Sequence, residues 1–243
     1  MASSTQLSDN DTTVLGVLFD PEASFEVESK PLRSSQSAYD EHIMSEIVRI
    51  EHEALASINE IEPAHQKLKS VIATLDMLVE DYSRYASAYS NRAQVRRLLY
   101  DPEHLFLDQP DVLDVILSDL SHAISLASPK QEGAVISPND SSVLSAAHTH
   151  RASLFYQASR LERSMTHAGP AKQILGLDAE QLEEGASRDF ALGAKHGNKM
   201  AKHLAVKTNP YAKMCASIVK QAMSRESVAD QGVLRDRVDI MAS

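Results

Sequence analysis

Two stretches of this chain repeat each other, and this repeat constrains the fold more than any other feature. AYSNRAQ (residues 88–94) and AHTHRAS (147–153) both place an aromatic residue or histidine three positions before Arg, with Ala directly after that Arg. Further along, SDLSHAISLAS (118–128) and RDFALGAKHG (188–197) both place a bulky residue three positions before a small one. The pattern predicts a helix pair used more than once, because such a unit buries its apolar face only against a neighbouring copy.

The spacing of apolar residues predicts helices over residues 37–224. Helix formers dominate, Gly and Pro number only 8 and 9, and Trp is absent, which favours an all-α protein over one with strands. Stripes at steps of three and four residues predict three helix pairs: Ser37–Asn59 with a helix beginning near Pro63, a helix beginning near Tyr82 with Val112–Leu126, and Ser141–Leu161 with Ala179–His196. Two shorter helices follow, NKMAKHLAVK and PYAKMCASIVKQAM, the second with Asn209 as its cap and Pro210 at its first position.

The two ends of the chain differ from this helical part. Residues 1–13 are polar and predict a disordered tail, and residues 225–243 predict a frayed one. Residues 14–36 predict an apolar docking segment followed by a linker. We expect its cluster VLGVLF (Val14–Phe19) to pack on the helical body, either along the first pair or inside a groove of the repeats, since a cluster this apolar seldom stays exposed. A mobile tail is the alternative.

The bulky-then-small spacing resembles the tetratricopeptide repeat, in which small residues let the two helices of a pair approach closely. The small residues here are Ala93, Ala123, Ala152, Ala186 and Gly193. The resemblance implies a right-handed α-solenoid of about three helix pairs, with long loops inserted between the helices of the second and third pairs. An ordinary helical bundle with Ala at close crossings is the alternative.

A C-terminal helix is expected to cap this stack. The segment from Pro210 to Met223 would cover the exposed apolar end, as terminal caps of solenoids do. The side chains expected to do so are Tyr211, Met214, Ile218 and Val219. With its end covered, the protein is expected to be a monomer.

Several segments, taken in order, are similar to the tetratricopeptide repeat protein 36 family. They are VLGVLFDPEASF, ASAYSNRAQVRRLL, LSDLSHAISLA, SRDFALGAKHG and NPYAKMCASIVKQAM, and the similarity covers most of residues 14–224. The resemblance implies a protein that works through protein contacts rather than chemistry. It also implies association with the chaperone Hsp70 and, in animals, a link to the control of tyrosine catabolism.

In such repeats the first helices line a concave groove that holds a peptide or a partner helix. Alignment with the repeat assigns three polar positions on each of two first helices to this groove, and a solvated polar face is the alternative: Asn91, Gln94, Arg97, His150, Ser153 and Tyr156. Arg92 and Arg151 are interpreted as structural instead, paired with carboxylates such as Asp119 or Asp189.

Repeats that grip the acidic tail of Hsp70 use a clamp of Lys, Asn and Arg, and this chain matches it poorly. Only Asn91 fits, whereas Ala146 and His150 stand at the positions of the third repeat's Lys and Arg. A dianionic terminus would meet few cations here, so we expect any contact with Hsp70 to use another surface.

Charge and cysteine content exclude other classes of partner and location. A formal charge of −10 and a pI near 5.4 predict repulsion from nucleic acid and from anionic lipid, so neither is expected as a partner. One cysteine permits no internal disulfide, and the N-terminal residues lack the pattern of a signal peptide. We expect an intracellular protein of the cytoplasm with access to the nucleus.

An enzyme or metal protein using the ten histidines is the alternative function. His148 and His150 would point about 200° apart on a helix, which suits a shared zinc poorly, and no His-Glu-x-x-His or Cys-x-x-Cys motif occurs. Cys215 stands in an apolar stretch and is expected to be a buried, inert thiol. The sequence therefore predicts no catalytic residue, no metal and no cofactor.

Overall fold

A computed structural model describes residues 38–58, 64–131, 134–161, 171–212, 214–221 and 223. All of them belong to one compact unit, Ser35–Ser243. The predicted tails, and the predicted docking segment with its linker, lie outside the described residues. The described part of the chain consists of helices and their connections, with no strand, which confirms the all-α prediction.

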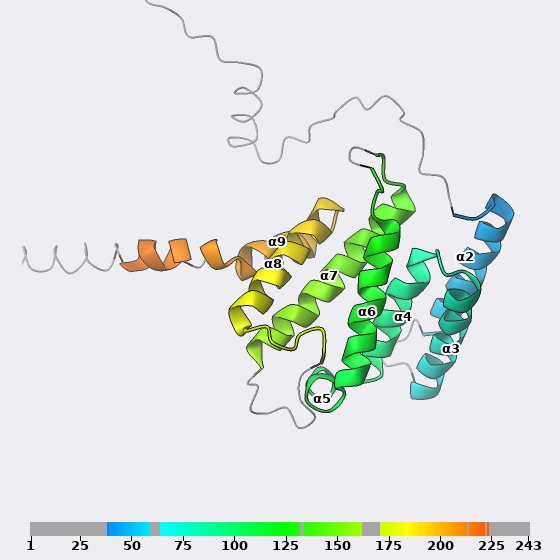
Figure 1. The fold of residues 1–243 in the computed structure, drawn as a ribbon, viewed down its shortest axis with the longest axis horizontal. Coiled ribbons are helices and arrows are strands. Elements are labelled where there is room, and N and C mark those ends of the chain that lie inside the picture. The colour runs from blue at the N-terminus through cyan, green and yellow to red at the C-terminus, as the bar shows by residue number, and fades with distance from the viewer. Residues whose placement is uncertain are drawn as a thin grey trace, which may run out of the picture. The chain divides into compact units, whose positions relative to one another are not determined.

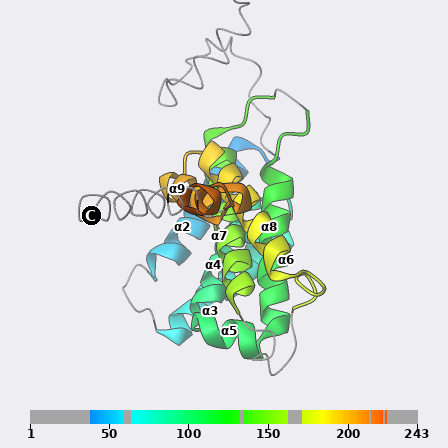
Figure 2. The same cartoon turned by 90° about the vertical axis from the view of Figure 1, so that its left-hand side faces the viewer.

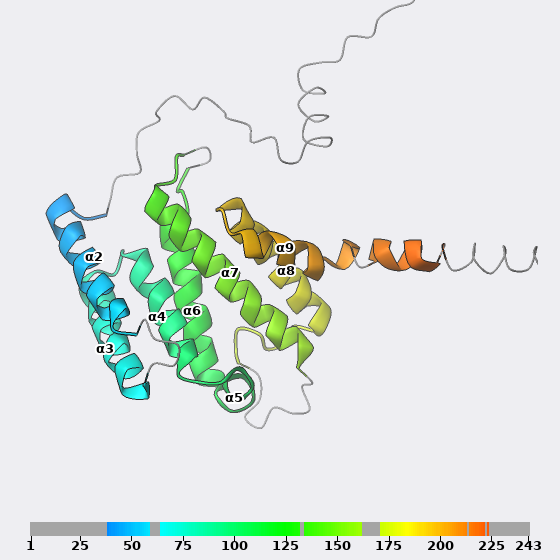
Figure 3. The same cartoon turned by 180° about the vertical axis from the view of Figure 1, so that it is seen from behind.

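The helices follow one another in space in the order of the sequence (Figures 1 and 3). Every predicted helix is present with ends shifted by a few residues, and one short helix, α5, was not predicted. The helices are α2 (Glu41–Ala56), α3 (His65–Asp81), α4 (Ala86–Leu98), α5 (Pro102–Asp108), α6 (Pro110–Ala127), α7 (Pro138–Arg160), α8 (Ala179–Lys195) and α9 (Lys199–Thr208).

The helices of the second and third predicted pairs pack on each other. Helix α4 packs on α6 and α7 packs on α8, α2 contacts α3, and further contacts join α3 to α4, α6 to α7 and α4 to α7. Figure 2 shows α6 and α8 to one side of α4 and α7. Helices α4 and α7 are therefore neighbours in one layer, and α6 and α8 back them.

Small residues allow these helices to lie close together. A Cβ added to Gly193 would come within 2.5 Å of Thr149 Oγ1 on α7 and 3.4 Å of the Ala201 Cβ on α9. The predicted small contacts of the other crossings are fully buried: Ala93, Ala123, Ala152 and Ala186. Large apolar side chains fill the space around them, among them Leu75, Ile116, Leu120 and Phe190, each contributing about 1.5–3 kcal/mol by burial.

The insertion between α4 and α6 contains α5. Asp101 caps this helix by accepting a hydrogen bond from the His104 N–H at 3.0 Å, and Pro102 occupies its first turn. Leu105 and Phe106 anchor it in the core. These start signals stand in the sequence DPEHLFLD, so the helix was predictable from it.

The insertion between α7 and α8 returns to α6. The Asp114 carboxylate accepts the backbone N–H groups of Lys172 and Gln173, both at 2.9 Å, and the Asp114 carbonyl accepts the Gln173 side-chain amide at 2.8 Å. Ala171 and Ile174 are buried in the core that α4, α6 and α7 share. The described end of this insertion, residues 171–177, is thus part of the fold.

The C-terminal helix lies differently from its prediction. Residues 210–212 and 214–221 are helical, and the Asn209 side chain accepts the Tyr211 N–H at 2.9 Å, which confirms the predicted cap. The side chains expected to cover the end of the stack are exposed instead, with fractions of 71% for Tyr211, 55% for Met214, 58% for Ile218 and 56% for Val219. Figure 1 draws this helix, in orange, running on beyond α9.

The expected capping arrangement is wrong because α9 already occupies that place. Ala201 is fully buried, and Leu204 and Ala205 pack with it against Phe190 of α8. The prediction for Cys215 is also wrong, since its thiol is exposed. Its apolar neighbours in sequence indicate an apolar helix face, and nothing in the described chain covers that face.

Among the described helices, none is both long and apolar enough to cross a membrane.

Candidate partner-binding surface

The six residues predicted to line a groove come from α4 and α7, which lie side by side. The structure gives these side chains different surroundings. Asn91 turns toward α2, Arg97 lies near His150, and Tyr156 packs in the cluster that α9 completes. Gln94 is exposed, and the Ser153 hydroxyl donates to the Thr149 carbonyl at 2.9 Å within α7.

The Asn91 side chain is engaged within the protein. Its amide nitrogen donates to Glu51 Oε1 of α2 at 2.9 Å and to Ser87 Oγ at 3.2 Å. A partner segment would have to compete with both of these hydrogen bonds. Asn91 therefore fixes α4 to α2 and offers little to an incoming ligand.

Glu51 of α2 is a buried hydrogen-bond acceptor that the sequence pattern did not predict. Its side chain is 7% exposed and accepts hydrogen bonds from Tyr85 at 2.6 Å and Ser87 at 3.0 Å as well as from Asn91. Burial, followed by the charge of this carboxylate, raises the pKa of Tyr85 above its usual range. The available signal was a glutamate one position from Ile50 on the striped helix, which is too weak to distinguish it from a solvated residue.

Two of the predicted surface residues, Arg97 and His150, have hydrogen-bonding capacity that the described protein leaves unused. His150 Nε2 is buried and has no hydrogen-bond partner among the described residues. Burial, and secondarily the charge of Arg97, lower the pKa of His150 to about 4, so its imidazole is neutral at physiological pH. Arg97 is half-buried, and no carboxylate pairs with it in the part of the chain that the structure describes. A guanidinium beside a neutral imidazole can donate hydrogen bonds to carbonyl or carboxylate oxygens.

Gln157 is a second polar group on the same side of α7. It lies seven residues after His150, which places the two on one face of the helix two turns apart. Its Oε1 is buried and also lacks a hydrogen-bond partner among the described residues. Sequence reasoning missed Gln157, since an unsatisfied acceptor is a property of packing that no local pattern reports.

The structural interpretation of Arg92 and Arg151 is confirmed. Arg92 grips Asp119 of α6 through Nε at 2.9 Å and Nη2 at 2.6 Å. Arg151 grips Asp189 of α8 in the same bidentate way, at 2.6 and 2.8 Å. The equivalent arginine of these two helix pairs therefore joins the first helix of its pair to the second.

Each lock extends beyond its own pair. Arg96 donates to Asp119 and to Asp76 of α3, both at 2.8 Å, and Arg92 also reaches Asp76 at 2.9 Å. In the α7–α8 pair, Arg151 Nη1 donates to Ser121 of α6 at 3.3 Å. These contacts connect α3, α4 and α6 in one network and α6, α7 and α8 in the other.

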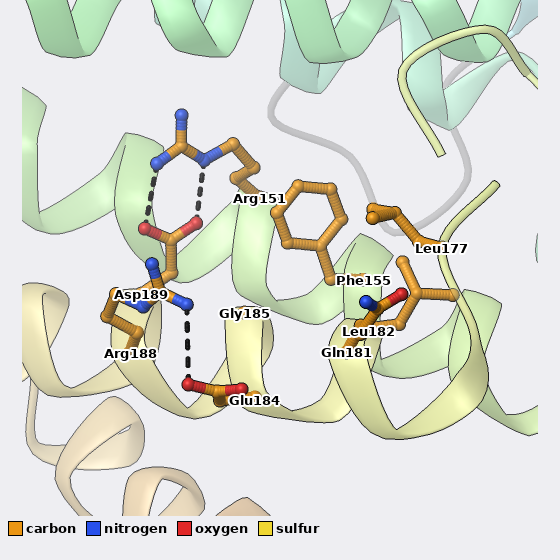
Figure 4. Close-up of a pocket in the computed structure, with 9 residues that line it drawn as sticks. All are labelled: Arg151, Phe155, Leu177, Gln181, Leu182, Glu184, Gly185, Arg188 and Asp189. Atoms are coloured by element: carbon orange, nitrogen blue, oxygen red, sulfur yellow. Dashed lines mark hydrogen bonds and ion pairs between the residues drawn. The ribbon is translucent and has the colours of Figure 1, made fainter. Parts of the chain in front are cut away.

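A shallow pocket of about 420 Å³ lies between α7 and α8 (Figure 4). Phe155, Leu177 and Leu182 supply its apolar wall, and Gly185 leaves room beside the Phe155 ring, which an added Cβ would meet at 3.4 Å. The charged groups around it are paired, Arg151 with Asp189 and Arg188 with Glu184 at 3.7 Å. None of the six predicted surface residues lines this pocket.

Among the described residues, no three His, Cys, Asp or Glu side chains lie close enough together to hold a metal ion. His148, one of the two histidines considered as a zinc pair, instead contacts Asp189 through Nδ1 at 2.9 Å.

Comparison with known proteins adds three relatives that span nearly the whole chain. The L-tyrosine degradation gene cluster protein hmgX of Aspergillus fumigatus is 36% identical over 92% of this chain and 94% of its own. Tetratricopeptide repeat protein 36 is 25% identical in Danio rerio, over 90% of this chain and 94% of its own, and 23% identical in Mus musculus, over 92% and 97%. No protein-family model and no solved structure matches the chain.

Proposed function

We propose that this chain, which belongs to the family of hmgX and tetratricopeptide repeat protein 36, is a non-catalytic adaptor that binds a segment of a partner protein and serves L-tyrosine degradation. The observation that carries the proposal is the relationship to hmgX along nearly the full length of both chains. The paired helices of this chain suit a protein that brings other proteins together.

The proposal assigns the helices to a right-handed solenoid of three pairs, α2–α3, α4–α6 and α7–α8, closed by α9. Its binding surface runs along α4 and α7. Arg97, His150 and Gln94 are its central residues, because the first two have hydrogen-bonding capacity that the described protein leaves unused and the third is exposed. Asn91, Ser153 and Tyr156 then shape the surface from within.

The test compares protein partners recovered with two variants. Gln94→Ala/Arg97→Ala removes the central side chains, and Arg160→Ala, at the exposed end of α7, is the matched control. Each tagged protein is incubated with extract of the native cells grown on L-tyrosine, and bound proteins are quantified by mass spectrometry. We expect the double variant to lose partners that the wild type and the control retain. Identical partner sets for all three proteins would contradict a surface along α4 and α7.

A cellular readout tests the link to L-tyrosine degradation separately. Cells lacking the protein are expected to clear L-tyrosine more slowly, and Gln94→Ala/Arg97→Ala should restore clearance less well than Arg160→Ala. We also propose that the protein contacts Hsp70 through a surface other than the clamp positions, and binding to purified Hsp70 tests this.

We further propose that the protein is a monomer and that it lies in the cytoplasm with access to the nucleus.

The alternative is an enzyme or metal protein that uses its histidines. Stoichiometric zinc in the purified protein by elemental analysis, or turnover of an L-tyrosine catabolite by the protein alone, would favour this alternative over the adaptor.

A further inference from the structure

The charges of this acidic protein are strongly segregated. Residues 190–225 contain six lysines and one arginine and no aspartate or glutamate, although the whole chain carries a formal charge of −10. The segment includes α9 and the C-terminal helix. A cationic segment of this length within an acidic protein indicates a partner of opposite charge.

The C-terminal helix also presents an uncovered apolar face. Tyr211, Met214 and Ile218 are spaced as i, i+3 and i+7, which aligns them on one side, and all three are more than half exposed. Every residue from 214 to 221 is exposed, so the described chain covers no side of the helix over these residues. Such a spacing of anchors is the one by which amphipathic helices enter apolar grooves.

An isolated helix of this length is marginal in water. Helices shorter than about 12–15 residues gain too little from their own hydrogen bonds to offset nucleation, and in proteins they depend on packing of an apolar face. The described helical residues of this segment, 210–212 and 214–221, do not exceed that limit. The helix is therefore expected to become stable only when its apolar face is buried by another molecule.

We propose that the C-terminal helix, described over residues 210–212 and 214–221, is a second binding element that inserts Tyr211, Met214 and Ile218 into an apolar groove of a partner protein whose rim carries carboxylates. The exposed lysines of α9, Lys199, Lys202 and Lys207, extend the positive charge toward that rim. This element is separate from the surface along α4 and α7 and does not rest on the function proposed for it.

Composition favours an acidic protein over two other occupants. The helical face lacks the Trp, Phe and Leu that anchor helices in a lipid interface. A second copy of the same helix would bring two cationic segments together without any carboxylate between them.

The single cysteine provides a direct test. Cys215 is the only cysteine of the chain, is exposed, and lies within the proposed contact segment, one residue after Met214. The full-length protein is labelled there with a benzophenone maleimide, irradiated in native cell extract, and the cross-linked peptide is sequenced by mass spectrometry. A second label at Ser217→Cys in a Cys215→Ser chain serves if the label at Cys215 blocks insertion.

The expected result has three parts. The label joins a partner peptide rich in Asp and Glu, the yield falls at least tenfold in Ile218→Asp, and it falls when salt is raised from about 50 to about 500 mM. A label at Leu175→Cys in a Cys215→Ser chain, on an exposed site before α8, should not give this product. The Gln94/Arg97 double variant should give it undiminished, so that failure of one proposed surface is distinguishable from failure of the other.

Other outcomes would overturn the proposal. These are a cross-link to a second copy of this chain, a cross-link to a peptide without acidic residues, or a yield that Ile218→Asp leaves unchanged. Binding of the wild type, but not Ile218→Asp, to vesicles of phosphatidylserine and phosphatidylcholine would assign the helix to a membrane surface instead.

Discussion

Replacing Asp189 by alanine should remove the lock between α7 and α8. Asp189 is 4% exposed and accepts hydrogen bonds from Arg151 Nε at 2.6 Å, Arg151 Nη2 at 2.8 Å and His148 Nδ1 at 2.9 Å. The substitution leaves a largely buried guanidinium and a buried imidazole without their acceptor. Breaking a buried pair from one side costs about 3–5 kcal/mol, and we expect the free energy of unfolding to fall by that amount.

Urea denaturation followed by circular dichroism measures this loss. Glu184→Ala is the matched control on the same helix, because Glu184 pairs with Arg188 at 3.7 Å on the exposed face, and its removal should change stability by no more than about 0.5 kcal/mol. The double variant Arg151→Ala/Asp189→Ala should lose less than the sum of its single variants, since it leaves no unpaired guanidinium. A loss below about 1 kcal/mol for Asp189→Ala would refute the reasoning.

The same carboxylate makes stability depend on pH. Burial alone would raise the pKa of Asp189, but the hydrogen bonds and charges of Arg151 and His148 outweigh it and lower the pKa below its usual value. The folded state thus binds this proton less readily than the unfolded state, whose pKa is about 3.9. The stabilisation is fully present above that value and is lost as the pH falls through the lower folded-state pKa. Asp189→Ala should abolish this component of the acid dependence.

Three further changes test the packing and the buried polar groups. Gly193→Ala should cost about 1–3 kcal/mol by overpacking, and Thr149→Ala should recover part of it in the double variant, since the added Cβ would meet Thr149 Oγ1 at 2.5 Å. Tyr85→Phe should lower the free energy of unfolding by about 1–3 kcal/mol, measured in urea, because it removes the 2.6 Å donor to buried Glu51. His150 should titrate near pH 4 by NMR, and a midpoint near 6.5 would show that its imidazole is solvated.

The sequence was informative wherever one physical requirement selects a residue type. Helix bounds followed from apolar spacing and caps, and the pairing of Arg92 with Asp119 and Arg151 with Asp189 followed from the repeat. These positions are constrained by contacts inside a single repeat, so a pattern recurring in the chain reports them.

The sequence was misleading where it had to indicate which element packs against a given helix face. The apolar spacing of the C-terminal helix is real, yet it indicates only that a face is suited to burial, and α9 took the place expected for it. The orientation of Asn91 was missed for a related reason. A polar residue at a groove position also fits a buried hydrogen bond to another helix, and the choice depends on Glu51 forty residues earlier.

The contact between Asp114 and residues 172 and 173 favours packing of α7 on the α8 of the same molecule. A connection of the length between α7 and α8 would let α8 of one molecule pack on α7 of another, since all side-chain contacts of the pair would be preserved in that exchange. By accepting two backbone N–H groups of the connection, Asp114 holds the start of α8 beside its own α6. Exchange would first have to break these hydrogen bonds and expose Ala171 and Ile174. The anchor therefore works against domain swapping through the connection between α7 and α8.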